Sequence, residues 1–374
     1  MKITDVEGIL LRLPEVREIG DGCQSVLIIK VHTDEGVTGI GEAHSNPEVS
    51  RAVLDSPLCS VSASGLKRLL IGEDPLAINR LWDKMYRHSQ TYGRRGAALH
   101  VISGIDIALW DILGKVAGQP IHRLLGGARR SVHRVYASDL APAEPTPAAM
   151  LAQAERHVAA GYGAVKFGWG GLGGDPRADV RAIGQMRKAL GDEVDIMVDL
   201  GFAVPLEDSI YLVQGLAEHR VFFLEEPLSP DDLPGFARLT AVSPTPIATG
   251  EKETTQYPFI DLMERGGLRI IQPDVARVGG ISESMRIAAL AEARGVRVIP
   301  HCWSTDILVA ATLHVIATLR DCPYLEYNVT DNPLRTDLLR EPLRPRGGEI
   351  ALPQGPGLGI ELEPETIARF RVDG

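Results

Sequence analysis

The stretch DIMVDLGFAVPLEDSIYLVQGLAEHRVFFLEE, residues 195–226, decides the fold. It contains two short apolar runs, each closed by a carboxylate, and a helical segment at 206–218 lies between them. A short apolar run bounded by turn residues is typical of a fully buried strand. A repeat of about 25 residues accommodates one strand, one helix and two short loops. The stretch therefore predicts a strand–helix–strand unit.

The same unit recurs along the chain, and each copy closes on an ionisable residue. Successive members are 26, 26, 23, 27 and 25 residues apart, and the six are Asp199, Glu225, Glu251, Asp274, His301 and Glu326. They end or closely follow the runs DIMVD, VFFLEEP, TPIATGE, LRIIQPD, VRVIPH and PYLEYN. Helix-capping acids would explain some of them, but caps have no reason to recur at strand ends with a histidine among them. We therefore predict a (β/α) barrel whose polar groups converge at the C-terminal ends of the strands, where barrel enzymes place their chemistry.

The barrel is expected over residues 131–330, with VHRVYAS as its first strand. Apolar runs predict eight strands and about seven helical connections. The later strands are expected at 163–168, 195–199, 221–225, 246–250, 269–272, 296–300 and 323–327. Helices are expected at 146–161, 177–190, 206–218, 256–265, 281–294 and 305–319.

The remaining segments predict a second, two-part module. In residues 1–125, KITDVEGILLRL and SVLIIKVHTDEGVTGIGEA alternate apolar and polar residues around a turn at 34–36, which is typical of antiparallel strands. Two or three helices follow, the clearest at 99–116, where apolar residues recur at helical spacing. The tail, residues 335–374, is rich in Pro and Gly turns and is expected to pack back on the first module. The fold class is thus α/β, a modified TIM barrel with an α+β capping domain.

Bulk properties narrow the functional class. The chain has 374 residues and a formal charge of −10, and this acidic balance argues against a nucleic-acid partner. No run of about 18 apolar residues and no leader-like N-terminus is present, so we expect a cytoplasmic protein without a membrane partner. The four cysteines form no CxxC pair and are expected to be reduced thiols. Cys302 follows His301, but the neighbouring acids favour a site other than a thiol nucleophile.

Three of the strand-end acids predict a metal site. Asp199, Glu225 and Glu251 follow adjacent strands and offer only oxygen ligands. Such a set suits Mg²⁺, with Mn²⁺ as the alternative, and disfavours Zn²⁺. Three protein ligands leave positions for water and for a substrate carboxylate. Glu226, next to Glu225, is expected to act as a supporting or loop-capping acid.

The other strand-end groups predict acid–base chemistry. Asp274 and His301 end neighbouring strands, and an Asp beside an imidazole fixes its tautomer and raises its pKa. Glu326 ends the last strand and, if protonated, would donate a hydrogen bond to an oxygen that gains negative charge. Lys166, in AVKFGWGG, is expected to face the metal and to pair with a substrate carboxylate, or simply with a strand-end acid. The Gly-rich run at 168–176 lacks the Lys-Ser/Thr ending of a phosphate cradle and is expected to be a lid or turn.

A metal, a base and a proton donor together define a reaction class. The α-proton of a carboxylate bound to Mg²⁺ is acidified, because the metal stabilises the enediolate formed when that proton is removed. His301 is the candidate that removes or returns the proton. The product then depends on the next step of the enediolate.

At this point the residues resemble the enolase superfamily, and within it the mandelate racemase group, over nearly the whole chain. The resemblance implies a capping domain over a modified barrel, with Mg²⁺ held by acids after the third, fourth and fifth strands. Those positions match Asp199 in IMVDLG, Glu225 in FLEEP and Glu251 in ATGEK. QPDVARVGG and VIPHCW match the Asp–His dyad, and YLEYN matches the Glu after the last strand.

The sequence departs from this family pattern at the second strand. Many relatives carry Lys-x-Lys there, whereas this chain reads Lys166-Phe167-Gly168. A racemase needs proton acceptors on both faces of the substrate carbon, so the missing lysine argues against racemisation. A single imidazole can remove the α-proton and then protonate a leaving β-hydroxyl. The sequence therefore predicts an acid-sugar dehydratase that acts on an aldonic or aldaric acid and gives a 2-keto-3-deoxy acid.

Two other functional classes stay open. An isomerase, lactone cycloisomerase or racemase would use the same enediolate, and a non-catalytic protein would keep only the metal and acid site. Substrate choice is expected to come from the capping segments 15–23 and 44–60, while Arg94 and Arg95 are candidates for a distal hydroxyl or carboxylate. By resemblance, a homo-oligomer is expected.

Overall fold

The computed structural model describes residues 1–374 apart from 21, 169, 202–203 and 373–374. Its described strands are β1 (Ile3–Arg12), β2 (Ser25–Thr33), β3 (Thr38–Ala43), β4 (Val132–Ser138), β5 (Ala164–Gly168), β6 (Asp195–Asp199), β7 (Val221–Glu225), β8 (Ile247–Thr249), β9 (Ile270–Ile271), β10 (Arg297–Val298), β11 (Leu325–Asn328) and β12 (Glu349–Ala351). Its helices are α1 (Pro47–Asp55), α2 (Lys67–Leu70), α3 (Ile78–Gly93), α4 (Ala97–Ala117), α5 (Ile121–Leu124), α6 (Pro147–Ala159), α7 (Pro176–Leu190), α8 (Leu206–Ala217), α9 (Leu233–Val242), α10 (Gln256–Glu264), α11 (Gly280–Glu292), α12 (Asp306–Ile316), α13 (Pro333–Thr336) and α14 (Pro364–Phe370). A 3₁₀ turn, η1, spans Gly22–Gln24.

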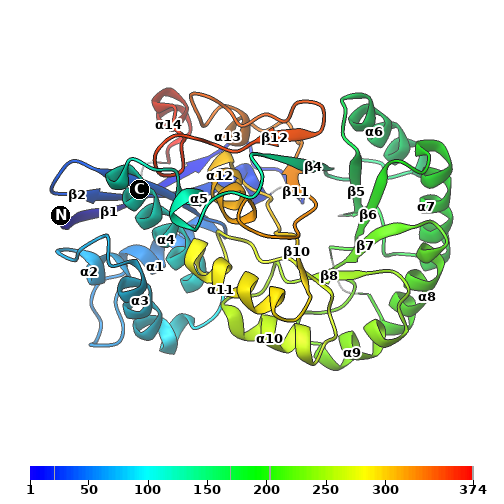
Figure 1. Ribbon diagram of the computed structural model, residues 1–374, viewed down its shortest axis with the longest axis horizontal. Helices are drawn as coiled ribbons and strands as arrows, with labels where there is room; N and C mark the ends of the chain where they lie inside the picture. Colours follow the sequence, from blue (N-terminus) through cyan, green and yellow to red (C-terminus); the bar gives the residue numbers. More distant parts are fainter. Residues whose placement is uncertain (21, 169, 202–203, 373–374) are drawn as a thin grey trace.

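Strands β1, β2 and β3 form an antiparallel meander, as the alternating pattern predicts. Helix α4 packs on β3 at unusually short range. A Cβ atom at Gly39 or Gly41 would lie 2.0 Å from the backbone oxygen of Ala108 or Gly104, so only glycine allows this approach. Helix α4 thereby joins the meander to the rest of the molecule, at the left in Figure 1.

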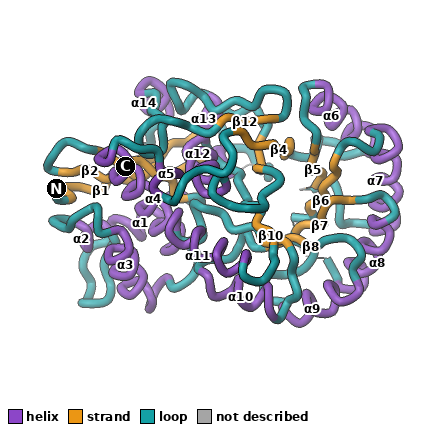
Figure 2. Tube along the Cα trace, in the orientation of Figure 1, coloured by secondary structure: helices purple, strands orange, loops and turns teal. Residues whose placement is uncertain are grey.

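Strands β4 to β11 form a parallel barrel with the order β10-β9-β8-β7-β6-β5-β4-β11. Helices α6 to α12 connect them, and α6 to α10 run around the outside of the ring (Figures 1 and 2). Eight strands and seven connecting helices match the prediction. Among the described residues no ladder joins β10 to β11, so the ring is left open at one seam. The fold class is therefore the predicted α/β modified barrel with a capping domain.

Helix α9 is the connection that the sequence analysis did not place. Its segment opens with several Asp and Pro residues, which suggest a loop, but Pro234 stands in the first turn, where a helix tolerates proline. The Asp232 side chain accepts a hydrogen bond from the Gly235 amide at 2.9 Å and caps the helix. Strands β8, β9 and β10 are also shorter than predicted, with 3, 2 and 2 residues.

The tail contacts both modules. Strand β12 pairs antiparallel with β4, while the Val372 amide donates to the carbonyl of Leu10 at 2.9 Å. Buried Asp111 on α4 also accepts a hydrogen bond from the Leu358 amide at 2.8 Å. These contacts tie the tail to the first sheet, where α14 contacts β1 (Figure 1). The residue limits 1–125, 131–330 and 335–374 stay a prediction.

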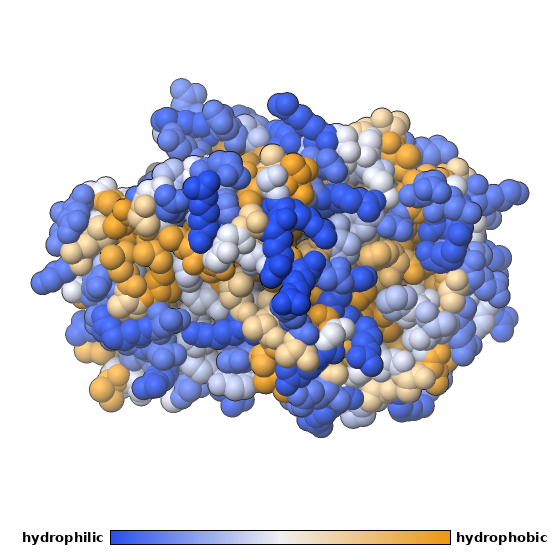
Figure 3. Space-filling model, viewed as in Figure 1, coloured by the Kyte–Doolittle hydropathy of each residue, from blue (hydrophilic) through white to orange (hydrophobic). Residues whose placement is uncertain are grey.

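Helix α4 is the one described helix long and apolar enough to cross a membrane, with 21 residues and a mean hydropathy of 1.5. However, 78% of its most apolar window is buried inside the protein, as expected for a core helix. On the surface seen in Figure 3, hydrophilic residues surround smaller hydrophobic areas, the broadest near the capping-domain end.

Candidate active site

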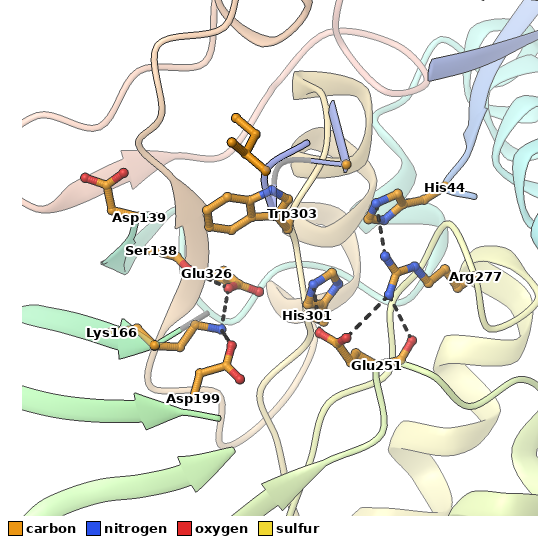
Figure 4. A pocket seen from close by; sticks show the side chains of 14 residues that line it. His44, Ser138, Asp139, Lys166, Asp199, Glu251, Arg277, His301, Trp303 and Glu326 are labelled. Atoms are coloured by element: carbon orange, nitrogen blue, oxygen red, sulfur yellow. Dashed lines mark hydrogen bonds and ion pairs between the residues drawn. The ribbon is translucent and has the colours of Figure 1, made fainter. Parts of the chain in front are cut away.

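A cavity of about 270 Å³ opens at the C-terminal ends of the barrel strands. Its described lining comes from barrel and capping segments: Ile19, Gly20, Gly22, His44, Ser138, Asp139, Lys166, Gly168, Asp199, Glu251, Arg277, His301, Trp303 and Glu326. Five of the seven predicted site residues thus border one space, and Figure 4 shows their side chains pointing into it. The other two, Glu225 and Asp274, are fully buried directly behind the lining.

Lys166 gathers three of the predicted acids. Its Nζ lies 2.9 Å from Glu225 Oε2, 3.3 Å from Asp199 Oδ2 and 2.8 Å from Glu326 Oε1. Sheet register explains the arrangement, because Asp199 pairs with Glu225 across β6 and β7 and Lys166 stands on the neighbouring β5. Burial opposes the charge of Lys166, but Glu225 and Glu326 hold its pKa well above the usual value. The lysine is therefore an ammonium that contacts three acidic side chains.

Glu326 accepts hydrogen bonds from two further groups. The Ser138 hydroxyl donates to its Oε1 at 2.8 Å and the Cys302 amide donates to its Oε2 at 2.7 Å. Burial alone would raise the pKa of Glu326, but Lys166 and His301 bring it to about 2. The Glu326 oxygens thus face three donors in this arrangement, and the role of a protonated Glu326 as a hydrogen-bond donor stays a prediction.

His301 lies between two acids. Its Nδ1 is 2.7 Å from Asp274 Oδ2, and its Nε2 is 3.0 Å from Glu251 Oε2. Burial lowers the pKa of His301, but Glu251, Glu326 and the hydrogen bond to Asp274 outweigh it and raise that pKa to about 9. Asp274 can only accept as a carboxylate, so the Nδ1–H of His301 points to it. That fixes Nε2 as the atom facing the cavity.

A second imidazole, from the capping domain, shares the same aspartate. His44 Nδ1 lies 2.9 Å from Asp274 Oδ2, and the His44 and His301 rings stack with centroids 5.8 Å apart. On its other side, His44 Nε2 is 3.1 Å from Arg277 Nη2. From the sequence, His44 is expected only as part of a capping segment, and no pattern indicates Arg277. The sequence signal that could have indicated His44 was its position directly after a predicted strand.

The donor atoms of the predicted metal ligands suit a hard cation. Burial raises the pKa of Asp199 to about 6, and it raises the pKa of Glu225 well above its usual value. Both pKa values are also raised by the other strand-end acids, so a further positive charge at this point would stabilise the ionised set. All donors are oxygens, as Mg²⁺ prefers.

Among the described residues, the trio that brings its ligand atoms within 4.8 Å of one another is His44, Asp274 and His301, and not the three predicted metal ligands. Here both imidazoles direct Nδ1 at the one Oδ2 of Asp274, so hydrogen bonds account for the grouping.

Comparisons with known proteins agree with this geometry. Residues 19–126 match the family described as mandelate racemase/muconate lactonizing enzyme, N-terminal domain, and residues 149–366 match the enolase C-terminal domain-like family. The chain belongs to the enolase superfamily, in its mandelate racemase group. The resemblance to this superfamily and group, predicted from the sequence, is confirmed.

Relatives of this enolase superfamily member carry names from two reaction classes. It is 34% identical to D-galactarolactone cycloisomerase of Agrobacterium fabrum, covering 92% of this chain and 91% of that protein. It is 35% identical to D-galactonate dehydratase of Ralstonia pickettii, covering 91% and 90%. The crystal structure of 3,6-anhydro-D-galactonate cycloisomerase from Zobellia galactanivorans superposes with a TM-score of 0.89 at 29% identity and 100% coverage of both chains.

The second-strand departure of this superfamily member has a structural basis. A Cβ atom at Gly168 would lie 1.8 Å from the backbone oxygen of Asp199, so a lysine does not fit there unless the backbone moves. Gly168 borders the cavity. The wall at this position therefore carries no side chain, and the second base of the Lys-x-Lys pattern has no replacement at this position.

Three other expectations concern neighbouring residues. Glu226 is buried outside the cavity lining, with a φ of 51°, and accepts hydrogen bonds from Thr249 Oγ1 at 2.5 Å and Lys252 Nζ at 2.6 Å, which suits a supporting acid. Arg95 lies over the Tyr257 ring in a separate surface pocket, and the reach of Arg94 and Arg95 toward a distal hydroxyl or carboxylate stays a prediction. In the expected lid at 168–176, residue 169 lies outside the described part of the chain.

Proposed function

We propose that this enzyme is a Mg²⁺-dependent acid-sugar dehydratase acting on an aldonic or aldaric acid. The observation that carries the proposal is the imidazole of His301, held by Asp274 with Nε2 toward the cavity, together with Gly168 in the cavity wall where the second lysine of the family pattern would stand. Relatives include arabinonate, galactonate and rhamnonate dehydratases, each over more than nine-tenths of this chain.

We propose Asp199, Glu225 and Glu251 as the ligands of Mg²⁺, with Mn²⁺ as the alternative. When bound, the cation would stabilise the negative charge that develops on the substrate carboxylate. Lys166, 3.3 Å from Asp199, is placed to pair with an oxygen of that carboxylate. Glu326 keeps the Lys166 ammonium in position from the other side at 2.8 Å.

His301 is the proposed base. Nε2 takes the α-proton, and the electron pair of the C–H bond passes to the carboxylate. The resulting imidazolium then donates its proton to the β-hydroxyl as the carbon–oxygen bond breaks, which releases water and leaves an enol that tautomerises to the 2-keto-3-deoxy acid. Glu251 now raises the pKa of His301 by direct contact. When Glu251 shares its charge with a cation it raises that pKa less, which brings His301 closer to the range of a base.

A cycloisomerase is the second candidate, because two of the similar proteins carry that name. It would use the same proton abstraction but would open or close a ring instead of releasing water. Formation of a 2-keto acid from an open-chain acid separates the two reactions.

The test is a screen of aldonic and aldaric acids with Mg²⁺ in which semicarbazide detects 2-keto acids, repeated in D₂O. Keto acid from one stereochemical family supports dehydration. Deuterium at the α-carbon without keto acid from open-chain acids would reject the dehydratase and favour the isomerase. The absence of both, with Mg²⁺ still bound, would favour a non-catalytic binding protein.

We also propose a cytoplasmic location and a homo-oligomeric state. A net charge of −10 disfavours nucleic acid as a partner. The hydrophobic area near the capping-domain end in Figure 3 is a candidate contact between subunits.

A further inference from the structure

Arg277 is a partly buried cation to which the proposed reaction assigns no role. It follows β9, lines the cavity, and its side chain is only 20% exposed. Figure 4 shows it on the far side of His301 from Lys166 and Asp199. The cavity therefore has a cationic group at each end.

The guanidinium has no short contact to a carboxylate. Its nearest acidic oxygens are Asp274 Oδ2 at 3.7 Å and Glu251 Oε1 at 3.8 Å. Both acids are engaged more closely by His301, at 2.7 and 3.0 Å. Lys166, in contrast, meets two carboxylates within 2.9 Å. A guanidinium carries five N–H donors, so Arg277 keeps donors for a ligand.

His44 holds Arg277 in place without neutralising it. The Nδ1–H of His44 donates to Asp274, so its Nε2 is an acceptor and takes an N–H of Arg277 at 3.1 Å. A second N–H, on Nη1, donates to the backbone oxygen of Glu251 at 3.3 Å. These two contacts fix the plane of the guanidinium at the cavity wall.

We propose that Arg277 binds the second carboxylate of a dicarboxylic sugar acid, at the end of the molecule away from the reacting carbon. This inference rests on the proposed function and selects aldaric over aldonic acids. A planar guanidinium pairs with a carboxylate through two parallel hydrogen bonds, which a terminal hydroxymethyl group cannot form. The rest of the wall includes Asp139, Asp199, Glu251 and Glu326, which would repel a carboxylate that lacked such a partner.

The test compares the kcat/KM for galactarate and glucarate with that for galactonate and gluconate. Wild type should prefer the diacids. Arg277→Gln should lose roughly 100-fold or more in kcat/KM for the diacids relative to its loss for the monoacids, mainly through KM. Arg277→Lys should restore part of the loss, and Arg95→Gln, an arginine outside the cavity, should match wild type. Equal loss on both acid classes, or wild-type preference for monoacids, would overturn the inference.

Binding without turnover separates this inference from the dehydratase proposal. Thermal shifts with adipate and hexanoate compare a diacid and a monoacid of equal length that carry no hydroxyl to eliminate. Adipate should stabilise wild type more than hexanoate, and Arg277→Gln should abolish that difference while circular dichroism remains unchanged. If no sugar acid yields keto acid but this pattern holds, the reaction assignment fails and the Arg277 role stands. An adipate shift that survives in Arg277→Gln would reject the Arg277 role even in an active dehydratase.

Discussion

The two sides of the cavity are built by different means. On one side, Lys166, Asp199 and Glu225 stand within strands β5, β6 and β7, whose register brings them together. On the other side, Glu251, Asp274 and His301 stand two or three residues beyond strands of only 3, 2 and 2 residues. That second side also receives His44 from the capping domain.

This contrast indicates which interactions position the side chains on each side of the cavity. A residue inside a paired strand is positioned by the ladder, whatever its own side chain contacts. A residue beyond a short strand depends on hydrogen bonds to its neighbours, such as the two imidazoles that share Asp274. The second side should therefore be sensitive to substitutions in the capping domain, while the first should depend mainly on its own residues.

The largest effect should come from the base itself. His301→Asn should reduce α-proton exchange in D₂O by about 10²–10⁴-fold, because Asn keeps a hydrogen bond to Asp274 but takes up no proton. Mg²⁺ affinity should change little, since all three carboxylates of the proposed ligand set remain. Nuclear magnetic resonance of the α-proton measures the exchange. Exchange near the wild-type rate would remove His301 from the role of base.

The next effect tests the strand-built side. Glu225→Gln should weaken Mg²⁺ binding by more than roughly 10-fold, because a buried carboxylate is lost from the proposed ligand set. Isothermal titration with Mg²⁺ provides the measurement. The matched control is Glu226→Gln, the adjacent acid, which bonds Thr249 and Lys252 outside the cavity and should leave Mg²⁺ affinity near wild type. Equal affinities in the two variants would contradict the assignment of Glu225.

A smaller effect tests how the capping domain supports the loop after β10. Buried Glu42 on β3 accepts hydrogen bonds from the hydroxyls of Ser304 and Thr305, just beyond His301. Glu42→Ala should lower the free energy of unfolding by about 1–3 kcal/mol, because both hydroxyls lose their partner. Burial raises the pKa of Glu42, so the neutral Glu42→Gln should be much closer to wild type. Urea denaturation of both variants measures the free energy of unfolding. Equal losses in the two variants would contradict the hydrogen-bond explanation and indicate that the shape of the Glu42 side chain matters instead.

The same contrast explains what the sequence predicted. The strand-built side was predictable because each buried strand is an apolar run that ends on its acid, as in VFFLEE at 221–226. The residues of the other side were predicted from their spacing in the sequence, but the contacts between them were not predicted. The pair Glu251–His301, at 3.0 Å, depends on loops whose course no local pattern specifies.

Residues from the capping domain were harder still. His44 reaches the dyad because β3 contacts α12 and the His44 amide donates to the carbonyl of Ala276 at 3.2 Å, and both contacts join residues far apart in the chain. Arg277 reads as one basic residue in a turn, and nothing in its neighbours distinguishes it from Arg95. Position distinguishes the two, because Arg277 lines the cavity and Arg95 lines a separate surface pocket, and these positions come from tertiary packing.

The smallest expected effect is therefore that of Arg95→Gln. Arg95 lies 5.7 Å from the centre of the Tyr257 ring in its own surface pocket, and an exposed contact of this kind contributes about 0.5–1 kcal/mol. The variant should lose no more than that in unfolding free energy and should keep the wild-type ratio of kcat/KM for diacids and monoacids. Comparison of Arg95→Gln with Arg277→Gln tests whether substrate preference requires an arginine in the cavity or only a positive charge on the protein. A change of this ratio in Arg95→Gln would mean that long-range electrostatic attraction contributes to the preference for diacids. The two arginines would then differ only in their distance from the substrate.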